Sequence, residues 1–359
     1  MELSRLRIEN LRLIERLELD LAPGWNFFVG PNGAGKTSLL EAAFLLSHGR
    51  SFRSTARDAL VRHGTVGYSV FGELRRSGGS VERVGIARSG SRLEARLNGE
   101  AVPAADLLRQ TAVLCFEPGS HELICGSSEV RRRFLDWGVF HVEHEFLQHW
   151  RRYQRALKQR NALLRRFASE SELYVWDREL VLAAEPLTAM RQEYVCALRP
   201  LIVDLLFQLL GELGEAHLLF QPGFDVERSL TAVLAERRGR DIARGHTTAG
   251  PHRADWALSF GTSIRREHLS RGQEKLCAFA CVMAQAQLFE ARAGGWPILC
   301  LDDLASEVDS EHQGKVLRTL IGSGAQILAT GTEEPAAFAG LGTQVTRFHV
   351  EQGRVARLL

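Results

Sequence analysis

Residues 30–37 read Gly30-Pro31-Asn32-Gly33-Ala34-Gly35-Lys36-Thr37, and they fit the pattern GxxxxGK[ST] in full. The stretch follows a compact apolar segment, residues 25–29, that reads as a strand. It opens a segment that reads as a helix from about Lys36 to His48. A strand, a glycine-rich loop and a helix in this order form the context that a phosphate-binding loop requires. Residues 30–37 therefore predict a nucleotide site in an α/β fold.

The residue types in this loop suit the binding of phosphate. Glycines allow backbone N–H groups to turn inward around an anion, and the N-terminus of the helix adds a partial positive charge. We expect Lys36 to neutralise the β- and γ-phosphates of ATP and Thr37 to place its hydroxyl on Mg²⁺. The alternative, a glycine-rich turn with a chance lysine, is disfavoured because the motif is complete and stands in the right context.

A second motif ends a hydrophobic strand with two acids. Residues 298–301 are apolar, and Asp302 and Asp303 follow them. In a protein with a phosphate loop we expect Asp302 to hold Mg²⁺ through its water shell and Asp303 to orient or deprotonate the attacking water. Two carboxylates that cap the following helix are the alternative. Many ATPases of this class carry glutamate at the second position. Aspartate is one methylene shorter and holds the attacking water less well, so we expect turnover on the order of a few per minute or less.

A third motif precedes the helix expected from Gln273 to Arg292. Leu269-Ser270-Arg271-Gly272-Gln273 resembles the LSGGQ signature of ABC ATPases, with Arg271 in place of the first glycine. Ser270, Gly272 and the helix N-terminus would form a second anion site, although Ser270 alone also fits an ordinary N-cap. One chain cannot easily bring this site to its own Lys36. The motif therefore predicts an ATP-dependent, head-to-tail homodimer with two composite sites.

Three further positions relate to this site. Residues 304–309 resemble the D-loop that touches the partner subunit in ABC ATPases. Residues 327–332 lack the switch histidine that transporter ATPases place there, so Thr330 or Thr332 is a candidate contact for the γ-phosphate. The glutamine nearest to the expected glutamine loop is Gln110, which is poorly placed, and that role stays unassigned.

The rest of the chain predicts an α/β body interrupted by a helical insertion. Period-two alternation from residue 65 to 99 indicates antiparallel strands, and leucines at helical spacing from 129 to about 213 indicate a helical lobe. We expect an ABC-type P-loop ATPase head, with a mixed sheet around the loop helix and no long coiled coil. The expected divisions are 1–120 and 297–359 for the ATPase lobe, 121–250 for the helical lobe, and 251–296 for the signature segment.

Bulk composition excludes some classes of protein. The net charge of the 359 residues is only +2, so charge alone does not indicate nucleic acid. The six cysteines form no CxxC pair or zinc-type cluster. The N-terminus has no apolar signal region, and no apolar run approaches the length of a membrane span. We expect a cytoplasmic protein without a membrane partner.

One segment has a local excess of positive charge. On a helix, Arg151, Arg155 and Lys158 would share one face that could follow DNA phosphates without reading sequence, and Trp150 and Tyr153 could stack on bases. A solvated helix face is the alternative. The basic residues from 131 to 166 are Arg131, Arg132, Arg133, Arg151, Arg152, Arg155, Lys158, Arg160, Arg165 and Arg166.

Several stretches together resemble the RecF family of bacterial ABC/SMC-like ATPases. They are residues 49–53, 131–138, 157–164, 250–255 and 302–307, and the resemblance spans essentially the whole chain. It implies ATP and DNA binding, an ATP-dependent dimer, and a role in recombinational repair of gapped DNA, replication restart and the SOS response. It also implies RecR and RecO as partners that help to load recombinase on single strands.

Two other functions stay open from the residues alone. One is the ATP-hydrolysing subunit of a transporter, which the missing switch histidine and the basic helical segment disfavour. The other is a nucleotide switch that does not hydrolyse ATP, which the paired aspartates disfavour. The group His252, Arg253 and Asp255 also has two interpretations, a loop near nucleotide or partner and an ion-paired structural turn, of which the structural one is slightly favoured.

Overall fold

In a computed structural model of the chain, the strand expected before residues 30–37 is β3 (Trp25–Val29), and the helix expected after them is α1 (Lys36–His48). The structure describes residues 1–54, 56–76, 78–261, 264–308, 310–334 and 344–358. The chain divides into two units, the first made of residues 1–121 and 270–359 and the second of residues 122–269. The second unit therefore also takes in residues 251–269, which the sequence grouped with the signature segment.

The sheet that carries the phosphate loop is mixed, as expected. Its strand order is β15-β14-β3-β13-β12-β8. The five strands from β14 to β8 pair in parallel, and β15 pairs antiparallel with β14. The carboxyl ends of β3, β13 and β12 consequently lie at one edge of the sheet. The remaining strands are β8 (Val113–Phe116), β12 (Ile298–Leu301), β13 (Ile327–Gly331), β14 (Val345–Glu351) and β15 (Arg354–Arg357).

A second sheet of the first unit is antiparallel, with the order β2-β1-β4-β5-β6-β7. Its alternating sequences bury one set of side chains and expose the other, which confirms the expected period-two strands. Its strands are β1 (Glu2–Leu11), β2 (Ile14–Asp20), β4 (Gly67–Arg75), β5 (Val81–Ser89), β6 (Arg92–Leu97) and β7 (Glu100–Val102).

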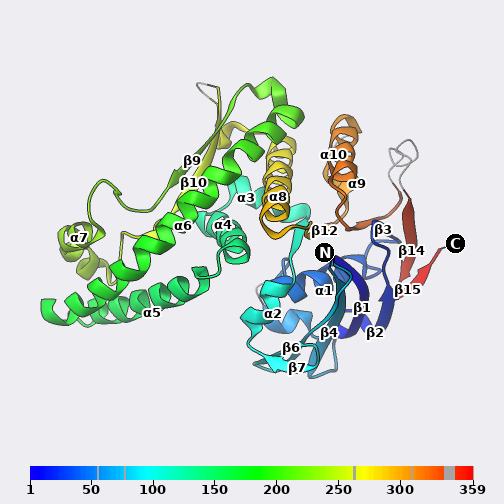
Figure 1. The fold of residues 1–359 in the computed structure, drawn as a ribbon, viewed down its shortest axis with the longest axis horizontal. Helices are drawn as coiled ribbons and strands as arrows, with labels where there is room; N and C mark the ends of the chain where they lie inside the picture. Colours follow the sequence, from blue (N-terminus) through cyan, green and yellow to red (C-terminus); the bar gives the residue numbers. More distant parts are fainter. Residues whose placement is uncertain (55, 77, 262–263, 309, 335–343, 359) are drawn as a thin grey trace. The chain divides into compact units, whose positions relative to one another are not determined.

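Helix α1 lies between these two sheets (Figure 1). Because it packs on both sides, it is apolar nearly all round, and Leu39, Leu40, Leu45 and Leu46 are all buried in the core that the sheets share. The first unit also contains α2 (Ala104–Gln110), α8 (Arg271–Ala293), α9 (Leu304–Glu307) and α10 (Ser310–Ser323).

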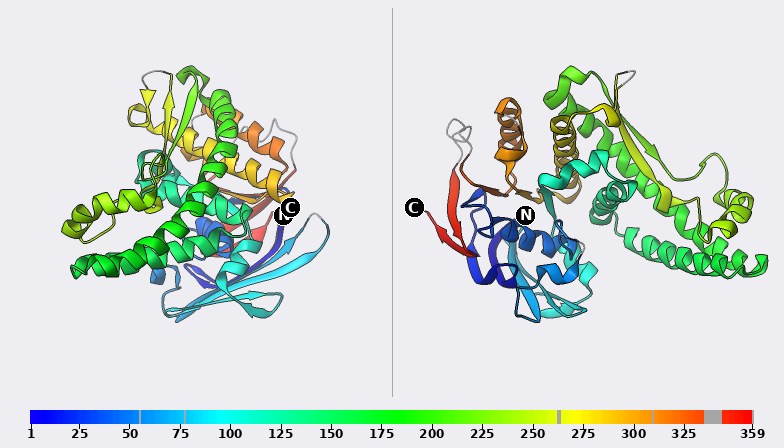
Figure 2. Two further views of the ribbon diagram at one scale, coloured as in Figure 1. Left: turned by 60° about the vertical axis from the view of Figure 1, so that its left-hand side comes forward. Right: turned by 180° about the vertical axis from the view of Figure 1, so that it is seen from behind.

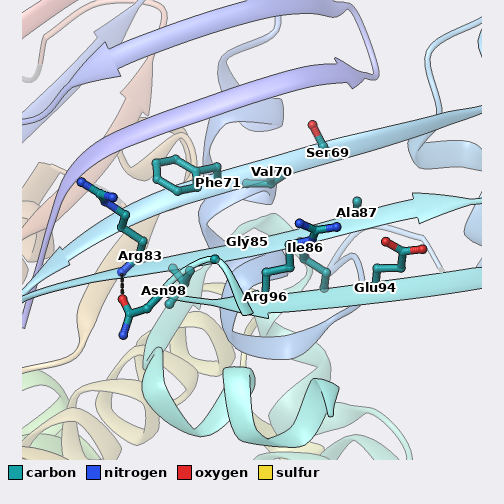
Figure 3. A pocket seen from close by; sticks show the side chains of 12 residues that line it. Ser69, Val70, Phe71, Arg83, Gly85, Ile86, Ala87, Glu94, Arg96 and Asn98 are labelled. Atoms are coloured by element: carbon teal, nitrogen blue, oxygen red, sulfur yellow. Dashed lines mark hydrogen bonds between the residues drawn. The ribbon is translucent and has the colours of Figure 1, made fainter. Parts of the chain in front are cut away.

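The outer face of the antiparallel sheet has a shallow hollow of about 290 Å³ across β4, β5 and β6. Figure 3 shows Phe71, Arg83 and Arg96 around Gly85, with the Asn98 side chain accepting a hydrogen bond from the Arg83 backbone. The hollow exists because glycine places no side chain at the centre of this face. It is mostly apolar, and nothing among its lining residues specifies a ligand.

The second unit consists of helices and one small antiparallel sheet of order β11-β10-β9. Helices α5 and α6 pack side by side in Figures 1 and 2. The expected helical segment 129–213 is confirmed, whereas β9 and α7 are not among the elements expected from the sequence. The elements are α3 (Glu122–Cys125), α4 (Ser128–Val142), α5 (Phe146–Arg165), α6 (Glu170–Leu210), α7 (Leu230–Arg244), β9 (Ala216–Gln221), β10 (Asp255–Phe260) and β11 (Ile264–Arg265).

Helix α6 is the longest described helix, with 41 residues, and it carries Pro186 and Pro200 in its interior. With the turn that follows it, to Leu213, it is long and apolar enough to span a membrane by length and composition alone, with a mean hydropathy of 1.6 in its most apolar window. The expectation that no apolar run approaches the length of a membrane span is therefore wrong for this helix. A buried helix of a folded domain passes the same test, and Leu198, Ile202, Leu205 and Leu209 are buried within the second unit.

A buried ion cluster joins three helices of the second unit. The Arg160 guanidinium donates to Asp177 at 2.6 Å, to Asp241 at 2.7 Å and to the Thr247 hydroxyl at 2.8 Å. Arg160 is fully buried, so it is not available to DNA, contrary to its inclusion in the basic segment. A buried arginine with two carboxylates holds α5, α6 and α7 in one arrangement.

Replacing Arg160 with alanine should destabilise the second unit by about 3–5 kcal/mol, because the buried Asp241 loses its arginine and the buried Asp177 keeps only the more distant Arg238, at 3.5 Å. Calorimetric melting of the whole chain measures the effect. Arg166→Ala removes an exposed arginine that pairs with Glu172 and should leave the transition nearly unchanged. Equal effects of the two substitutions would show that burial of the cluster contributes nothing.

Candidate functional site

The phosphate loop has the conformation of an anion cradle. Gly33 and Gly35 have φ of 79° and 107°, and Gly35 is the N-cap of α1 without a side-chain capping bond. The first N–H groups of α1 are therefore directed out of the helix end, where an anion would accept from them. The loop is braced from the β14–β15 turn, since the Gly353 N–H donates to the Ala34 carbonyl at 2.8 Å.

Gly30 is required by packing. A Cβ atom at this position would lie 2.1 Å from the Val350 carbonyl oxygen, which belongs to β14. The first glycine of the motif thus allows the loop to pass close to a neighbouring strand, and any side chain would displace one of the two backbones.

The Lys36 ammonium lies inside the loop. It donates to the Gly30 carbonyl at 2.7 Å and to the Pro31 carbonyl at 3.0 Å. Burial lowers the pKa of this ammonium, and the nearby carboxylates of Asp303 and Asp302 raise it in part. Two of its three hydrogens are used by the loop, so the ammonium is held at the cradle with one donor still to give.

Asp302 stands at the end of β12 and accepts two hydroxyl bonds. Its Oδ1 accepts from the Thr37 hydroxyl at 3.0 Å and from the Thr330 hydroxyl at 2.7 Å. Burial raises the pKa of this carboxyl, although the two hydroxyls and the charge of Arg53 lower it in part. The expected approach of Thr37 to Asp302 is therefore present, from positions 265 residues apart.

Asp303 has an unusual backbone and an unpaired oxygen. Its φ of 54° and ψ of 43° are left-handed, and its N–H donates to the Thr330 hydroxyl at 3.0 Å. Its Oδ1 is buried without a hydrogen-bond partner in the described part of the chain. A buried acceptor held by a strained backbone is what a water-orienting carboxylate needs.

These donors fit Mg²⁺. A hydroxyl and a carboxylate in contact, Thr37 and Asp302, supply the oxygen ligands that this ion prefers, and phosphates and waters usually complete its shell. No group of three or more histidine, cysteine or acidic side chains among the described residues forms a metal site of its own. The arrangement suits an ion that arrives with a nucleotide.

Two residues of the site were not assigned from sequence: Thr330 was one of two candidates, and Arg53 was not considered. The Thr330 hydroxyl bonds the Asp302 carboxylate and the Asp303 backbone N–H, because β13 lies between β3 and β12, and its contact with the γ-phosphate stays a prediction. Arg53 belongs to a loop that Ser51 holds, since the Ser51 hydroxyl accepts from the Arg53 N–H at 2.9 Å and bonds the buried Glu41 of α1. Only the arrangement in space reveals either role.

The signature residues begin α8. The Ser270 hydroxyl accepts from the Gln273 N–H at 3.3 Å, and the Gln273 side chain accepts from the Ser270 N–H at 3.0 Å, which forms a capping box. Ser270, Arg271 and Gly272 are exposed. Within the described residues, positions 270–273 form no hydrogen bond with positions 30–37. The N-cap role of Ser270 is thus present in the single chain, and the motif stays open to another molecule.

The neighbouring expectations have mixed outcomes. Lys275 of α8 pairs with Glu307 at 2.8 Å, which ties the signature helix to the segment that resembles the D-loop. Asp309 of that segment lies outside the described residues, and Thr332 is exposed. Gln110 is the last residue of α2, where it accepts hydrogen bonds from Arg76. The position directly after β8, where the glutamine loop would begin, is held by Glu117, so Gln110 does not supply that loop.

The basic segment of the second unit is divided by the fold. Arg151, Arg155 and Lys158 are all exposed on α5, as expected. Tyr153 is buried and pairs with His252 at 2.6 Å, so the expectation that it stacks on bases is wrong. Arg131 is likewise buried and bonds Asp255 at 2.6 Å.

The group around His252 has the structural role. Its Nε2 lies 3.0 Å from the Thr247 carbonyl, and burial lowers the pKa of this imidazole to about 4. A neutral histidine between Tyr153 and a backbone carbonyl packs the turn that precedes β10. It has neither the exposure nor the charge expected for a phosphate contact.

Asp302→Asn should raise the melting temperature of the nucleotide-free protein at pH 7 by about 1–3 °C. Burial raises the pKa of Asp302, so the folded state binds a proton there more readily than the unfolded chain, and the ionised carboxylate lowers stability at neutral pH. Asparagine keeps an acceptor for Thr37 and Thr330 without the charge. The gain should disappear as pH falls towards about 4, the ordinary value for aspartate. A lower melting temperature at pH 7 would contradict this account.

Comparison with known proteins agrees with this geometry. The model of the RecF/RecN/SMC N-terminal domain matches residues 2–354. The DNA replication and repair protein RecF of Stenotrophomonas maltophilia (strain R551-3) is 46% identical over 361 residues, covering 99% of both chains. That of Azotobacter vinelandii (strain DJ / ATCC BAA-1303) is 40% identical over 363 residues, again covering 99% of both.

Solved structures show the same fold. A structure of the recombination mediator protein RecF with ATP has a TM-score of 0.89 at 23% identity, covering 99% of this chain and 97% of the other. An SMC head bound to the C-terminal winged-helix domain of ScpA has a TM-score of 0.61 at 13% identity, covering 100% and 98%. These likenesses confirm the expected α/β head without a long coiled coil.

Proposed function

Since the chain belongs to the RecF family of DNA replication and repair proteins, we propose that it binds ATP with Mg²⁺ and closes as a homodimer that holds DNA during recombinational repair and replication restart. The dimer hydrolyses ATP slowly, with DNA as the stimulant, and its lifetime sets how long DNA is held. With partner proteins it helps to load recombinase on gapped DNA, in the context of the SOS response.

One observation carries the proposal. The cradle of residues 30–37, the Thr37–Asp302 contact and the unpaired Asp303 oxygen meet at one edge of the sheet. The signature residues 270–273, of which Ser270, Arg271 and Gly272 are exposed, make no described bond to that cradle. A complete phosphate and metal site in one chain, with a second anion site left open, fits a pair of chains that share two nucleotides.

Each residue of the cradle has a defined task in this account. The phosphates lie in the loop formed by Gly30, Pro31, Asn32, Gly33, Ala34, Gly35, Lys36 and Thr37 and accept from its free backbone N–H groups. Pro31 has no N–H, and the N–H groups of Gly30 and Ala34 donate to the Gly331 and Pro31 carbonyls. Lys36 balances their charge. Thr37 and Asp302 hold Mg²⁺, which supplies neutralisation of the developing charge. Asp303 orients water through its Oδ1 and takes the proton of that water.

Membership of the family supports a proposed location and proposed partners. Solved relatives are described as recombination mediators in the RecFOR pathway, which supports RecO and RecR as partners here. DNA is the ligand of the exposed basic face of α5, with Arg151, Arg155 and Lys158 on its phosphates. The protein acts in the cytoplasm, where chromosomal DNA is available.

The alternatives are weaker. A transporter subunit needs a membrane partner and is disfavoured by the absence of a histidine from residues 327–332. A switch that does not hydrolyse ATP leaves Asp303, with its left-handed backbone and buried oxygen, without a task. Relatives that match the chain over 99% of its length are DNA replication and repair proteins, and neither alternative explains this.

Asp303→Asn tests hydrolysis apart from binding. Because a water-orienting base contributes about 10²–10⁴-fold to a rate, phosphate release should fall by at least about a hundredfold. ATP-dependent dimerisation should persist, and DNA should dissociate more slowly from the ATP-bound protein, as measured by a competitor chase. Asp58→Asn, an exposed aspartate of the first unit, is the matched control. Unchanged phosphate release would remove Asp303 from the reaction.

A further inference from the structure

An open pocket of about 490 Å³ lies between helices α5 and α6 of the second unit. It is lined by Arg151, Arg152, Arg155, Ala156, Trp176 and Glu179. Helix α5 packs against α6, and both belong to the second unit, so the pocket is formed within one unit. Its volume falls in the range of small-molecule sites, about 300–1,000 Å³, which is enough for one nucleotide.

The charges of this pocket are unbalanced. Arg152 pairs with Glu179 at 2.9 Å, which lowers the pKa of that carboxyl, and the charge of Arg155 contributes further. Arg151 and Arg155 have no ion-pair partner in the described part of the chain. Three guanidinium groups against one carboxylate leave two positive charges at the pocket, and anions are the ligands that such a site attracts.

The pocket also has an aromatic wall. Trp176 is half-buried, unlike its neighbours Leu173 and Leu180, which are fully buried and form the core face of α6. The indole is therefore not needed to fill the core, and part of its surface faces the pocket. A flat aromatic surface beside unpaired guanidinium groups is a combination that accepts a base by stacking and its phosphate by charge.

We infer that this pocket binds one unstacked nucleotide of single-stranded DNA, with the base on Trp176 and the flanking phosphates on Arg151 and Arg155. The ion pair with Glu179 holds Arg152 at the wall. The inference rests on the proposed DNA-binding function and adds a base-level contact that a continuous duplex cannot make, because its bases stay stacked inside the helix. The pocket therefore gives α5 a preference for single strands.

The test compares two DNA forms on the full-length protein with ATP. Trp176→Ala should weaken binding of a 20-nucleotide single strand by about 5- to 150-fold in fluorescence anisotropy, since one base stack contributes about 1–3 kcal/mol. Binding of a blunt 20-base-pair duplex should change less than about twofold. Trp176→Phe, which keeps an aromatic face and guards against a folding defect, should lie between wild type and Trp176→Ala.

The controls separate this pocket from general charge. Tyr174→Ala removes an exposed aromatic of α6 that does not line the pocket and should change neither affinity. Arg151→Ser with Arg155→Ser should reduce the salt slope for the single strand by about 0.7 per lost phosphate contact. Equal loss on both DNA forms for Trp176→Ala, or no loss on the single strand, would overturn the inference.

Two further outcomes identify other occupants or other failures. Displacement of the single strand by polyglutamate of matched charge, with the same dependence on Trp176, would assign the pocket to an acidic protein and overturn the inference. A wild-type protein that binds no DNA would overturn the proposed function as well. DNA binding and ATP-dependent dimerisation that are insensitive to Trp176 would overturn only the pocket.

Discussion

Lys36→Ala is expected to weaken binding of ATP with Mg²⁺ by at least about a hundredfold and to abolish the ATP-dependent dimer. The Lys36 ammonium is held by the loop carbonyls of Gly30 and Pro31 and interacts electrostatically with the carboxylates of Asp303 and Asp302. Without it, only Mg²⁺ and the backbone N–H groups of the loop would offset the repulsion between the phosphates and the two carboxylates, and charge-assisted bonds such as those of Lys36 are among the strongest single contacts.

This substitution should not harm the fold. Burial lowers the pKa of Lys36, which means that the folded protein disfavours the charged form, so alanine should leave the melting temperature of the nucleotide-free protein unchanged or raised. Isothermal calorimetry with ATP measures the affinity. Lys315→Ala on α10 is the control and should bind ATP normally. Normal ATP affinity in Lys36→Ala would refute the assignment of the cradle.

Ser270→Asp is expected to abolish dimerisation while leaving ATP binding by the monomer intact. Aspartate caps a helix as well as serine does, so the cap of α8 and the stability should be kept. The added carboxylate would, however, oppose the phosphate of the partner's nucleotide, which should weaken the ATP-dependent dimer by about a hundredfold or more. Sedimentation velocity with ATP measures this.

Ser270→Thr is the matched conservative change, because threonine keeps both the cap and the hydroxyl. It should dimerise with ATP nearly as the wild type does. If Ser270→Asp also dimerised normally, Ser270 would be a helix cap and nothing more, which is the role that the single chain already shows.

Local motifs explain how much of the site could be predicted from sequence. Each of the two motifs, the loop 30–37 and the pair Asp302 and Asp303, directly follows a strand that the local sequence indicates. The elements around both motifs could therefore be predicted closely. Thr330 was not, because its bonds to both acids depend on β13 lying between β3 and β12.

Burial was the main property that the sequence could not supply. Arg160 and Tyr153 share α5 with the exposed Arg151, and charge or aromatic character alone does not separate them. The carboxylates that neutralise Arg160 come from α6 and α7, 17 and 81 residues away. The short apolar run of β9 was also ambiguous, because its strand character depends on pairing with β10.

The central claim, two composite sites between two copies, is tested most directly by mixing Lys36→Ala with Ser270→Asp in equal amounts and sedimenting the mixture with ATP. Neither variant should dimerise alone. A mixed pair has one site built from the intact cradle of one chain and the intact Ser270 of the other, so we predict that dimer returns only in the mixture, and with ATP. A mixture that stays monomeric while the wild type dimerises would contradict the claim.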